Sequence, residues 1–292
     1  MPFPNPFELE GNWYRTNLHT HSTDSDGWMA PDKVATAYRR EGYHALAITD
    51  HGVVTDTSAL SAEGFLMLPG IEFHLGRSEL GGLYHVVAIG VERAPPPGLE
   101  LQPAIRMLAQ AGAFVFLAHP YWSGLTCADL MSIDGYHAIE VYNTVCDVMI
   151  ARGQSMVHWD DLLTRGRAVG GVAVDDCHHG YDDLHQGWLM VKAPELTRAA
   201  MVEAMRAGAY YASSGPTIES VRADHGRVEV ACSPVRRISL VAAPGLGADR
   251  MAGEGESLTG ATLPVHSETN YARVQLIDHV GRMAWTQPVV WR

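Results

Sequence analysis

The sequence predicts an α/β fold in which helices connect the strands of a parallel sheet, followed by a smaller all-β region. Two observations support this class. Before residue 214, apolar runs of strand length alternate with helical patterns about seven times, which is typical of parallel β/α units. From about Gly215 onward, short β-like runs are separated by Gly, Pro, Asp and Ser, and no long helical pattern is left. We therefore expect a β/α domain over residues 1–214 and a small β-rich domain over residues 215–292.

The first half of the alternating region begins with an apolar, β-rich run at residues 13–18. Pro31 opens a helix, because its missing N–H costs nothing in the first turn, and Gly42 is a natural end for that helix. Residues 45–49 form a continuous apolar run, which is typical of a strand buried on both faces. Two further strands are predicted at residues 65–71 and 84–90.

The second half continues the alternation. Helices are predicted at about residues 103–111 and 155–165, because each pattern is apolar at helical spacing and a glycine follows it. A last helix begins after Thr197, a natural N-cap, and ends at Gly208. The remaining strands are expected at residues 113–118, 138–143, 168–174, 218–221, 228–231, 238–242, 272–277 and 283–291, with a loop at 244–260.

Composition and charge exclude several classes of protein. The formal charge is −12 and the chain has no basic run, which argues against a protein that grips nucleic acid through its phosphates. The four cysteines are scattered, so neither a disulfide framework nor a thiolate zinc site is indicated. The sequence has no signal-peptide pattern and no apolar run of about 20 residues, the length of a membrane span. We expect a cytoplasmic protein without membrane contact that acts on a small molecule, at most a nucleotide or short oligonucleotide.

Residues of metal-ligand type follow the ends of the predicted strands. His19 and His21 end the first run, and in an extended chain residues two apart project from the same face. Neutral imidazole is the commonest protein ligand for metals. In closed parallel barrels, functional residues gather at the carboxyl ends of the strands. The candidate ligands at such positions, six histidines and three carboxylates, are His19, His21, Asp26, His51, Glu72, His85, His119, Asp176 and His178.

In their order, these motifs resemble the PHP (polymerase and histidinol phosphatase) family over residues 13–214. The motifs that carry the resemblance are His19-Thr20-His21, Asp26, Thr49-Asp50-His51, Gly70-Ile71-Glu72, His85, Ala118-His119-Pro120 and Asp176-Cys177-His178. Within the family, the chain is most similar to the carbaryl-hydrolase-like branch, on the basis of residues 13–19, 210–216 and 284–288. The resemblance implies a distorted seven-stranded (β/α) barrel of PHP type, to which the C-terminal all-β region is an appendage.

The resemblance also implies a division of the ligands among two or three divalent metal ions. His19, His21 and Asp176 would hold the first ion. Glu72 would bridge it to a second ion, completed by His85 and His119, and the third would be held by Asp26, His51 and His178. Mixed imidazole and carboxylate ligands suit zinc, manganese or iron, and the ligand types do not choose among them.

Other side chains near the motifs are candidates for catalysis or for substrate binding. Asp50 directly precedes His51 and is a candidate catalytic carboxylate, although adjacent residues of a strand face opposite sides, which equally favours a structural role. Histidines outside every motif, such as His44 and His137, are expected to be structural or solvated. The candidates for binding substrate are His74, Arg77, Glu140, Asn143 and His179.

The expected activity is metal-dependent hydrolysis. A hydroxide that bridges two cations is a nucleophile at neutral pH, and the cations take up charge that develops on a phosphoryl or carbonyl oxygen. We expect a phosphoesterase (EC 3.1) acting on a small phosphomonoester or phosphodiester. Two alternatives stay open. Hydrolysis of a carboxyl or carbamate ester is favoured by the few basic residues in the motif loops, and a metal-stabilised scaffold would bind without catalysis.

Overall fold

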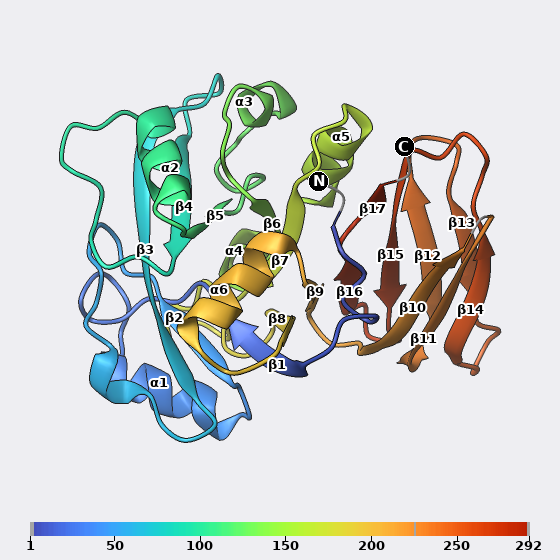
Figure 1. Ribbon diagram of the computed structural model, residues 1–292, viewed down its shortest axis with the longest axis horizontal. Coiled ribbons are helices and arrows are strands. Elements are labelled where there is room, and N and C mark those ends of the chain that lie inside the picture. The colour runs from blue at the N-terminus through green and yellow to red at the C-terminus, as the bar shows by residue number, and fades with distance from the viewer. Residues whose placement is uncertain (1–2, 225, 291–292) are drawn as a thin grey trace.

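The computed structural model describes residues 3–224 and 226–290. Figure 1 shows a ring of strands with flanking helices on one side of the molecule and a stack of antiparallel strands on the other. The two parts share strands of one large sheet, whose order is β13-β12-β15-β16-β9-β8-β1-β2-β3-β4-β5-β6-β7. The fold is therefore α/β with a mixed sheet, and its β-rich part is continuous with the ring.

The first seven strands are neighbours in chain order. The pairs β1–β2, β2–β3, β5–β6 and β6–β7 are parallel, whereas β3–β4 and β4–β5 are antiparallel. These strands confirm the apolar runs predicted before residue 175: β1 (Asn12–Asn17), β2 (Ala45–Ile48), β3 (Leu66–Arg77), β4 (Leu83–Ile89), β5 (Phe114–Leu117), β6 (Ala138–Asn143) and β7 (Gly170–Val174).

The prediction of a wholly parallel sheet is wrong at β4. The connection between β3 and β4 is a tight turn, in which the Ser78 N–H donates to Gly82 O (2.8 Å) and the Gly82 N–H to Ser78 Oγ (3.1 Å). So short a connection joins only antiparallel strands, since parallel strands need a crossover of a dozen residues or more. The apolar periodicity of a strand carries no information about the direction of its neighbour.

The carboxyl ends of β1 and β7 meet beyond the two strands. Thr20 and Cys177 form a parallel bridge, the His21 N–H donates to Cys177 O (2.9 Å), and the Asp176 N–H donates to His19 O (2.8 Å). Along its own length, β1 does not pair with β7 but with β8 (Trp188–Ala193), in the antiparallel direction. The seven strands thus curve until their ends touch at one rim, while a closed seven-stranded barrel stays a prediction.

The helices lie in the connections between strands. Those predicted at residues 31, 103, 155 and 198 are confirmed, and α6 has the expected Thr197 cap (Oγ1 to Ala200 N, 3.4 Å) and Gly208 end at φ 79°. Two short helices, α3 and α4, were not predicted. The helical elements are α1 (Pro31–Arg40), η1 (Ser58–Leu60), α2 (Leu101–Gln110), α3 (Cys127–Met131), α4 (Thr144–Ile150), α5 (Met156–Thr164) and α6 (Arg198–Ala207).

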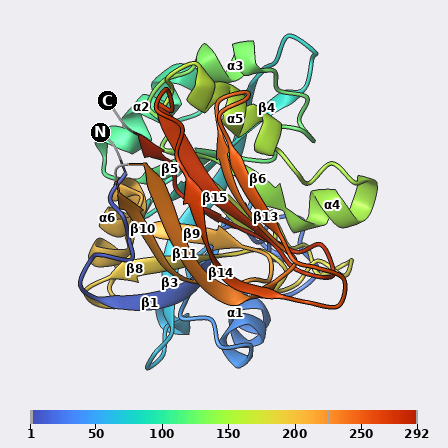
Figure 2. The same ribbon diagram turned by 90° about the vertical axis from the view of Figure 1, so that its right-hand side faces the viewer.

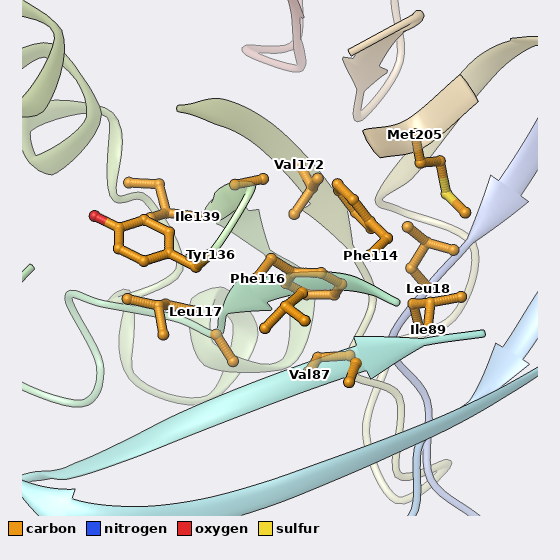
Figure 3. Close-up of a cluster of buried hydrophobic side chains, with 14 of the residues drawn as sticks. Leu18, Val87, Ile89, Phe114, Phe116, Leu117, Tyr136, Ile139, Val172 and Met205 are labelled. Atoms are coloured by element: carbon orange, nitrogen blue, oxygen red, sulfur yellow. The ribbon is translucent and has the colours of Figure 1, made fainter. Parts of the chain in front are cut away.

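The main core fills the ring of strands and the space beneath its helices. Figure 3 shows Val87 and Phe116, from the neighbouring strands β4 and β5, in one apolar cluster with Leu18 and Met205. All four are fully or almost fully buried. Burying each such side chain stabilises the fold by about 1.5–3 kcal/mol, so the strand ends above this core have a rigid base.

The region after residue 214 is all-β over its described residues, 215–224 and 226–290, as predicted. It forms a second sheet, β10-β11-β14, that faces the far end of the large sheet; both are seen in Figure 2. Apolar side chains such as Val230, Leu263 and Leu276 pack between them. The strands are β9 (Tyr210–Ser213), β10 (Ile218–Asp224), β11 (Arg227–Val235), β12 (Arg237–Ala242), β13 (Ala248–Met251), β14 (Leu258–Pro264), β15 (Tyr271–Ile277), β16 (Met283–Thr286) and β17 (Val289–Val290).

The loop predicted at residues 244–260 is wrong in part, because it contains β13 and the start of β14. Residues 248–251 include the charged Asp249 and Arg250 and are mostly exposed at the sheet edge, so the run is too short and too polar to be predicted as a strand. Trp291, at the end of the last predicted strand, lies outside the described residues. No helix among the described residues is long and apolar enough to cross a membrane.

Candidate metal centre

The structure brings the nine predicted ligands together at one rim of the ring. His19, His21, His51, His119, Asp176 and His178 lie in the turns that follow strands, and Glu72 and His85 lie on the β3–β4 hairpin. At two ligands, His119 (φ 30°) and Asp176 (φ 54°), the backbone adopts left-handed conformations that side chains disfavour. Such local strain persists where surrounding contacts enforce it, as they commonly do at functional sites.

Glu72 lies at the centre of the cluster and is almost fully buried. Its Oε2 is 3.1–3.2 Å from three imidazole nitrogens, those of His19, His21 and His51. Its Oε1 is 2.8 Å from His85 Nδ1 and 3.5 Å from His119 Nε2. The two oxygens of one carboxylate therefore face two different sets of imidazoles.

The inner part of the cluster has the spacing of a four-donor metal site. His19 Nε2 and His21 Nε2 are 3.2 Å apart, and both lie 3.0–3.2 Å from Glu72 Oε2 and from Asp176 Oδ1. Four donors that each lie about 2.0–2.1 Å from a tetrahedral ion are about 3.3 Å from one another. One cation at the centre of these four atoms would bind a lone pair of each of them. The residues present fit a metal ion.

The outer part of the cluster is more open. Asp26 Oδ1 is 3.6 Å from His21 Nδ1 and 3.5 Å from His178 Nε2, and Asp26 Oδ2 is 3.6 Å from His51 Nε2. Asp26 is about half exposed (55%). His51 Nδ1 is buried and lies 3.2 Å from Glu72 Oε2, but makes no hydrogen bond in the described part of the chain. Its lone pair is therefore available to bind a cation. A second group of potential ligands thus adjoins the inner one.

The electrostatics of the inner group show why it needs positive charge. Burial raises the pKa of Glu72 and of Asp176, but the neighbouring histidines outweigh it and hold both pKa values well below their usual range. Burial lowers the pKa of His21, but hydrogen bonds and attraction from Asp176 and Glu72 raise it to about 9. Both carboxylates therefore stay ionised in a buried place. Divalent cations would supply this balancing charge in place of the histidine protons, which their binding would release.

Glu140 and Asn143 stand behind the ligands and do not line the cavity beside them. Both are fully buried. Glu140 Oε1 accepts from His19 Nδ1 (2.6 Å), and Oε2 accepts from the His119 N–H (2.7 Å) and from Asn143 Nδ2 (2.8 Å). Asn143 Nδ2 also donates to Asp176 Oδ2 (3.0 Å). We therefore assign both residues to the positioning of ligands, in place of the substrate contact predicted for them.

Asp50 does not face the cluster either. Its buried carboxylate accepts hydrogen bonds from the Ser22 N–H (2.7 Å), from Ser22 Oγ and Ser25 Oγ (2.6 Å each) and from Thr55 Oγ1. Burial raises the pKa of Asp50, but these hydrogen bonds outweigh it and lower the pKa. Asp50 therefore shapes the loop that carries His21 and Asp26, and the catalytic role predicted for it has no support in its contacts.

The other three predicted substrate residues lie beside the cluster rather than in it. His74 is exposed opposite His85 on the hairpin, with its ring 5.4 Å from the His85 ring. Arg77 is exposed and its Nη1 donates to Gly81 O (2.7 Å) in the hairpin turn. His179 is half-buried with Nδ1 3.4 Å from Cys177 Sγ. Of the three, His74 has its ring beside two candidate ligands, His85 and His51, the latter 5.9 Å away.

A cavity of about 240 Å³ opens over the cluster. Five of its lining residues were not predicted: Trp122, Val145, Cys146, Met149 and Tyr181. Trp122 lies two residues after the Ala118-His119-Pro120 motif. Val145 and Met149 are four residues apart, about one helical turn, in the segment that follows β6. The spacing of Val145 and Met149 is visible in the sequence, but the short helix α4 that carries them was not predicted.

No protein-family model matches this sequence, and no curated protein does so. Among solved structures, the chain is similar to a two-domain protein from Bacteroides vulgatus described as containing a PHP-like metal-dependent phosphoesterase, with 19% identity, TM-score 0.53, and 99% of this chain and 98% of that one covered. The chain is also similar to a metal-dependent phosphoesterase candidate from Bifidobacterium adolescentis, with 16% identity, TM-score 0.44, and 57% of this chain and 89% of that one covered. An amidohydrolase from Chromobacterium violaceum is similar with 15% identity, TM-score 0.49, and 66% of this chain and 96% of that one covered. The first likeness spans both parts of the molecule and shows a shared fold.

Proposed function

We propose that this protein is a metal-dependent hydrolase of the PHP family, and a phosphoesterase acting on a small phosphomonoester or phosphodiester. The observation that carries the proposal is the placement of Glu72, whose two oxygens face separate sets of imidazole nitrogens. A carboxylate in that position is suited to bridge two cations. The PHP-like fold shared with the Bacteroides vulgatus protein supports the family assignment.

We keep the division of candidate ligands that the resemblance implies, although in the structure His51 also lies close to Glu72 and His85. His19, His21 and Asp176 would hold one ion, and Glu72 would join it to another beside His85 and His119. The outer group, Asp26, His51 and His178, would hold a third. When bound, such ions lower the pKa of water and neutralise charge on phosphoryl oxygens.

The protein's own residues hold the ring nitrogens in the orientation that this chemistry needs. Glu140 accepts from His19 Nδ1, so the lone pair of His19 Nε2 faces the cluster. Ser123 Oγ is 2.9 Å from His119 Nδ1, which leaves His119 Nε2 to face Glu72 and Asp176. Buried partners of this kind fix both tautomer and ring direction.

Hydrolysis of a carboxyl or carbamate ester is the second candidate. It is favoured by the charge of the cavity, because its lining residues include no Lys or Arg. A phosphate group in the cavity would depend on the metal ions for positive charge, whereas a neutral carboxyl or carbamate ester needs less positive charge around it. We place phosphate esters before carboxyl esters because two cations joined by Glu72 would neutralise the charge on the phosphoryl oxygens.

Turnover of two nitrophenyl esters, a phosphate and an acetate, by protein loaded with manganese or zinc tests these alternatives. We expect release from the phosphate, and a loss of at least about 100-fold in kcat for His119→Ala, because a ligand at Glu72 is removed. Circular dichroism would verify that the variant is folded. Release from the acetate alone would favour the second candidate. Bound metal without turnover of either ester would make the protein a scaffold.

A further inference from the structure

The cavity has two unlike walls. One is the cluster of imidazoles and carboxylates, and the other is apolar: Val145 and Met149 from α4, Trp122 from the turn after β5, and Tyr181 from the turn after β7. Val145 and Met149 are four residues apart and so lie on one face of their helix. A substrate held at the cluster therefore has this apolar wall beside it.

The apolar wall is fixed relative to the cluster. Asn143 Oδ1 accepts from the Cys146 N–H (3.0 Å) and caps α4, while Nδ2 of the same side chain binds Asp176 and Glu140. The Trp122 ring lies edge-on to His119, with centroids 5.0 Å apart. One amide side chain thus ties the helix that carries Val145 and Met149 to the ligands themselves.

Three of the four side chains of this wall are exposed although they are large and apolar, and Val145 is buried. Trp122 is 40% exposed, Met149 46% and Tyr181 51%. Exposed apolar surface that rims a cavity is characteristic of a ligand-binding face. A hydroxyl-rich group would lose water against Val145 and Met149, which offer no hydrogen-bond donor, and that loss is unfavourable. At these two side chains the wall therefore disfavours hydroxyl-rich groups, such as a polyol or the ribose of a nucleoside.

Size and charge narrow the choice further. The cavity volume of about 240 Å³ lies below the ~300–1,000 Å³ usual for drug-sized ligands. The lining contains no Lys or Arg, and Asp26 stands at its open side. The group that meets the apolar wall is thus small and carries no negative charge of its own.

We propose that the substrate bears an apolar, uncharged group of about one ring in size, which packs on Trp122, Met149 and Tyr181 while the scissile ester lies at the cluster. This inference rests on the proposed function for the position of the ester. It adds the substrate class: small esters of an aryl or arylalkyl alcohol rather than of a polyol or nucleoside.

The test compares benzyl phosphate with glycerol 1-phosphate on metal-loaded protein. Both leaving groups are alkoxides, so a difference in kcat/KM reports recognition of the ring more than ease of departure. We expect a preference of at least tenfold for benzyl phosphate. Calorimetric titration with benzylphosphonate and 2,3-dihydroxypropylphosphonate provides a readout without turnover, and should show the same preference in Kd.

Met149→Ala tests the wall directly, because Met149 is half-exposed and its truncation should leave the fold intact. We expect the benzyl-to-glycerol ratio to fall at least threefold in both kcat/KM and Kd. Met251→Ala is the matched control: the same substitution at a 53% exposed methionine on β13, outside the cavity lining. It should leave both ratios unchanged.

A wild-type preference for the glycerol compounds, or a ratio that Met149→Ala does not move, overturns the inference. Benzyl acetate and glycerol monoacetate separate it from the proposed function. Turnover of the acetates alone with a benzyl preference would remove the phosphoesterase and keep the apolar subsite. Turnover of glycerol 1-phosphate in preference would keep the phosphoesterase and remove the subsite. If no ester is hydrolysed, the proposed function fails and the phosphonate titrations still decide the inference.

Discussion

At the scale of single residues, Glu140 organises the site from behind the candidate ligands. Its two oxygens bind the imidazole of His19 and the backbone N–H of His119. One of these contacts sets a ring and the other holds a strained backbone at φ 30°. A buried carboxylate that touches two ligands in this way acts on metal affinity without touching substrate.

Glu140→Gln should lower metal affinity by about 10–100-fold, because the amide no longer anchors the His19 Nδ1–H with a full charge. Competition with a chromophoric chelator would measure this for zinc or manganese. Glu63→Gln, at an exposed position outside the cluster, is the control and should bind metal as the wild type does. Unchanged affinity in Glu140→Gln would contradict the positioning role.

The residue scale also shows where sequence reasoning succeeds. The nine candidate ligands stand in recognisable motifs, and the structure brings their side chains together, while their binding of metal stays a prediction. Glu140 and Asn143 were given the wrong neighbours, because a strand-end position does not say whether a side chain points to the cavity or behind it. Trp122 and Tyr181 belong to irregular loops, whose paths no periodicity describes.

At the scale of elements, two histidines outside every motif share one structural device. His44 precedes β2 and His137 precedes β6. The Nδ1 of His44 accepts the Arg15 N–H, and the Nδ1 of His137 accepts the Val115 N–H (3.1 Å each). Each ring thus replaces a backbone carbonyl at the start of a parallel strand pair. Both were expected to be structural or solvated, and the structural alternative is the right one.

This device makes the strand starts sensitive to pH. Burial, with the nearby charges of Arg15 and Arg206, lowers the pKa of His44 and of His137 below 6.5 in the folded protein. The neutral rings therefore stabilise the fold at pH values above 6.5. That contribution is lost as the pH falls below 6.5 through the folded-state pKa, because a protonated Nδ1 cannot accept.

The paired variant His44→Asn/His137→Asn, whose amide oxygens accept but do not titrate, should show a smaller loss of unfolding free energy between pH 7.5 and 5.5 than the wild type. In the variant His44→Leu/His137→Leu, the free energy of unfolding at pH 7.5 should fall by about 1 kcal/mol per site, because the backbone N–H groups of Arg15 and Val115 lose their acceptors. Urea unfolding at both pH values measures these differences. Equal pH dependence in the Asn variant and the wild type would refute the role of the rings.

Elements longer than about nine residues with clear periodicity were predicted well, as α1 and α6 show. The failures have a common physical cause. α3 and α4 span five and seven residues, too few for a helical period to stand out from chance. The direction of β4 depends on the length of the turn before it, which apolar patterns do not report.

At the scale of the molecule, the C-terminal region reaches back to the strand that leads to the ligands. Gln287 is almost fully buried. Its Oε1 accepts the Gly171 N–H and its Nε2 donates to Gly171 O (3.0 Å each), in the middle of β7. Since β7 is the last strand of the large sheet, this amide takes the place of a neighbouring strand. Asp176 lies two residues after the end of β7.

Gln287→Ala should destabilise the protein by about 2–4 kcal/mol, because it leaves two buried backbone groups of Gly171 without partners. Urea unfolding measures the change, and Gln110→Ala at an exposed helix end is the control. A loss within about 0.5 kcal/mol, the usual range for surface substitutions, would mean that water replaces the amide.

The two-part organisation was predictable from the change of texture near residue 215, whereas the continuity of the sheet was not. β16 pairs with β9, a contact between segments about 70 residues apart that leaves no local signal. The proposed boundary between residues 214 and 215 therefore separates two kinds of sequence within one hydrogen-bonded sheet.

The amide of Gln287 also has a consequence for the order of events during synthesis. Gly171 leaves the ribosome 116 residues ahead of its partner. During that interval the edge of β7 is uncovered in the nascent chain, and an uncovered strand edge pairs readily with strands of other molecules. Slowed translation between these two points prolongs the exposure, so the yield of correctly assembled protein depends on how quickly its last strands follow the first seven.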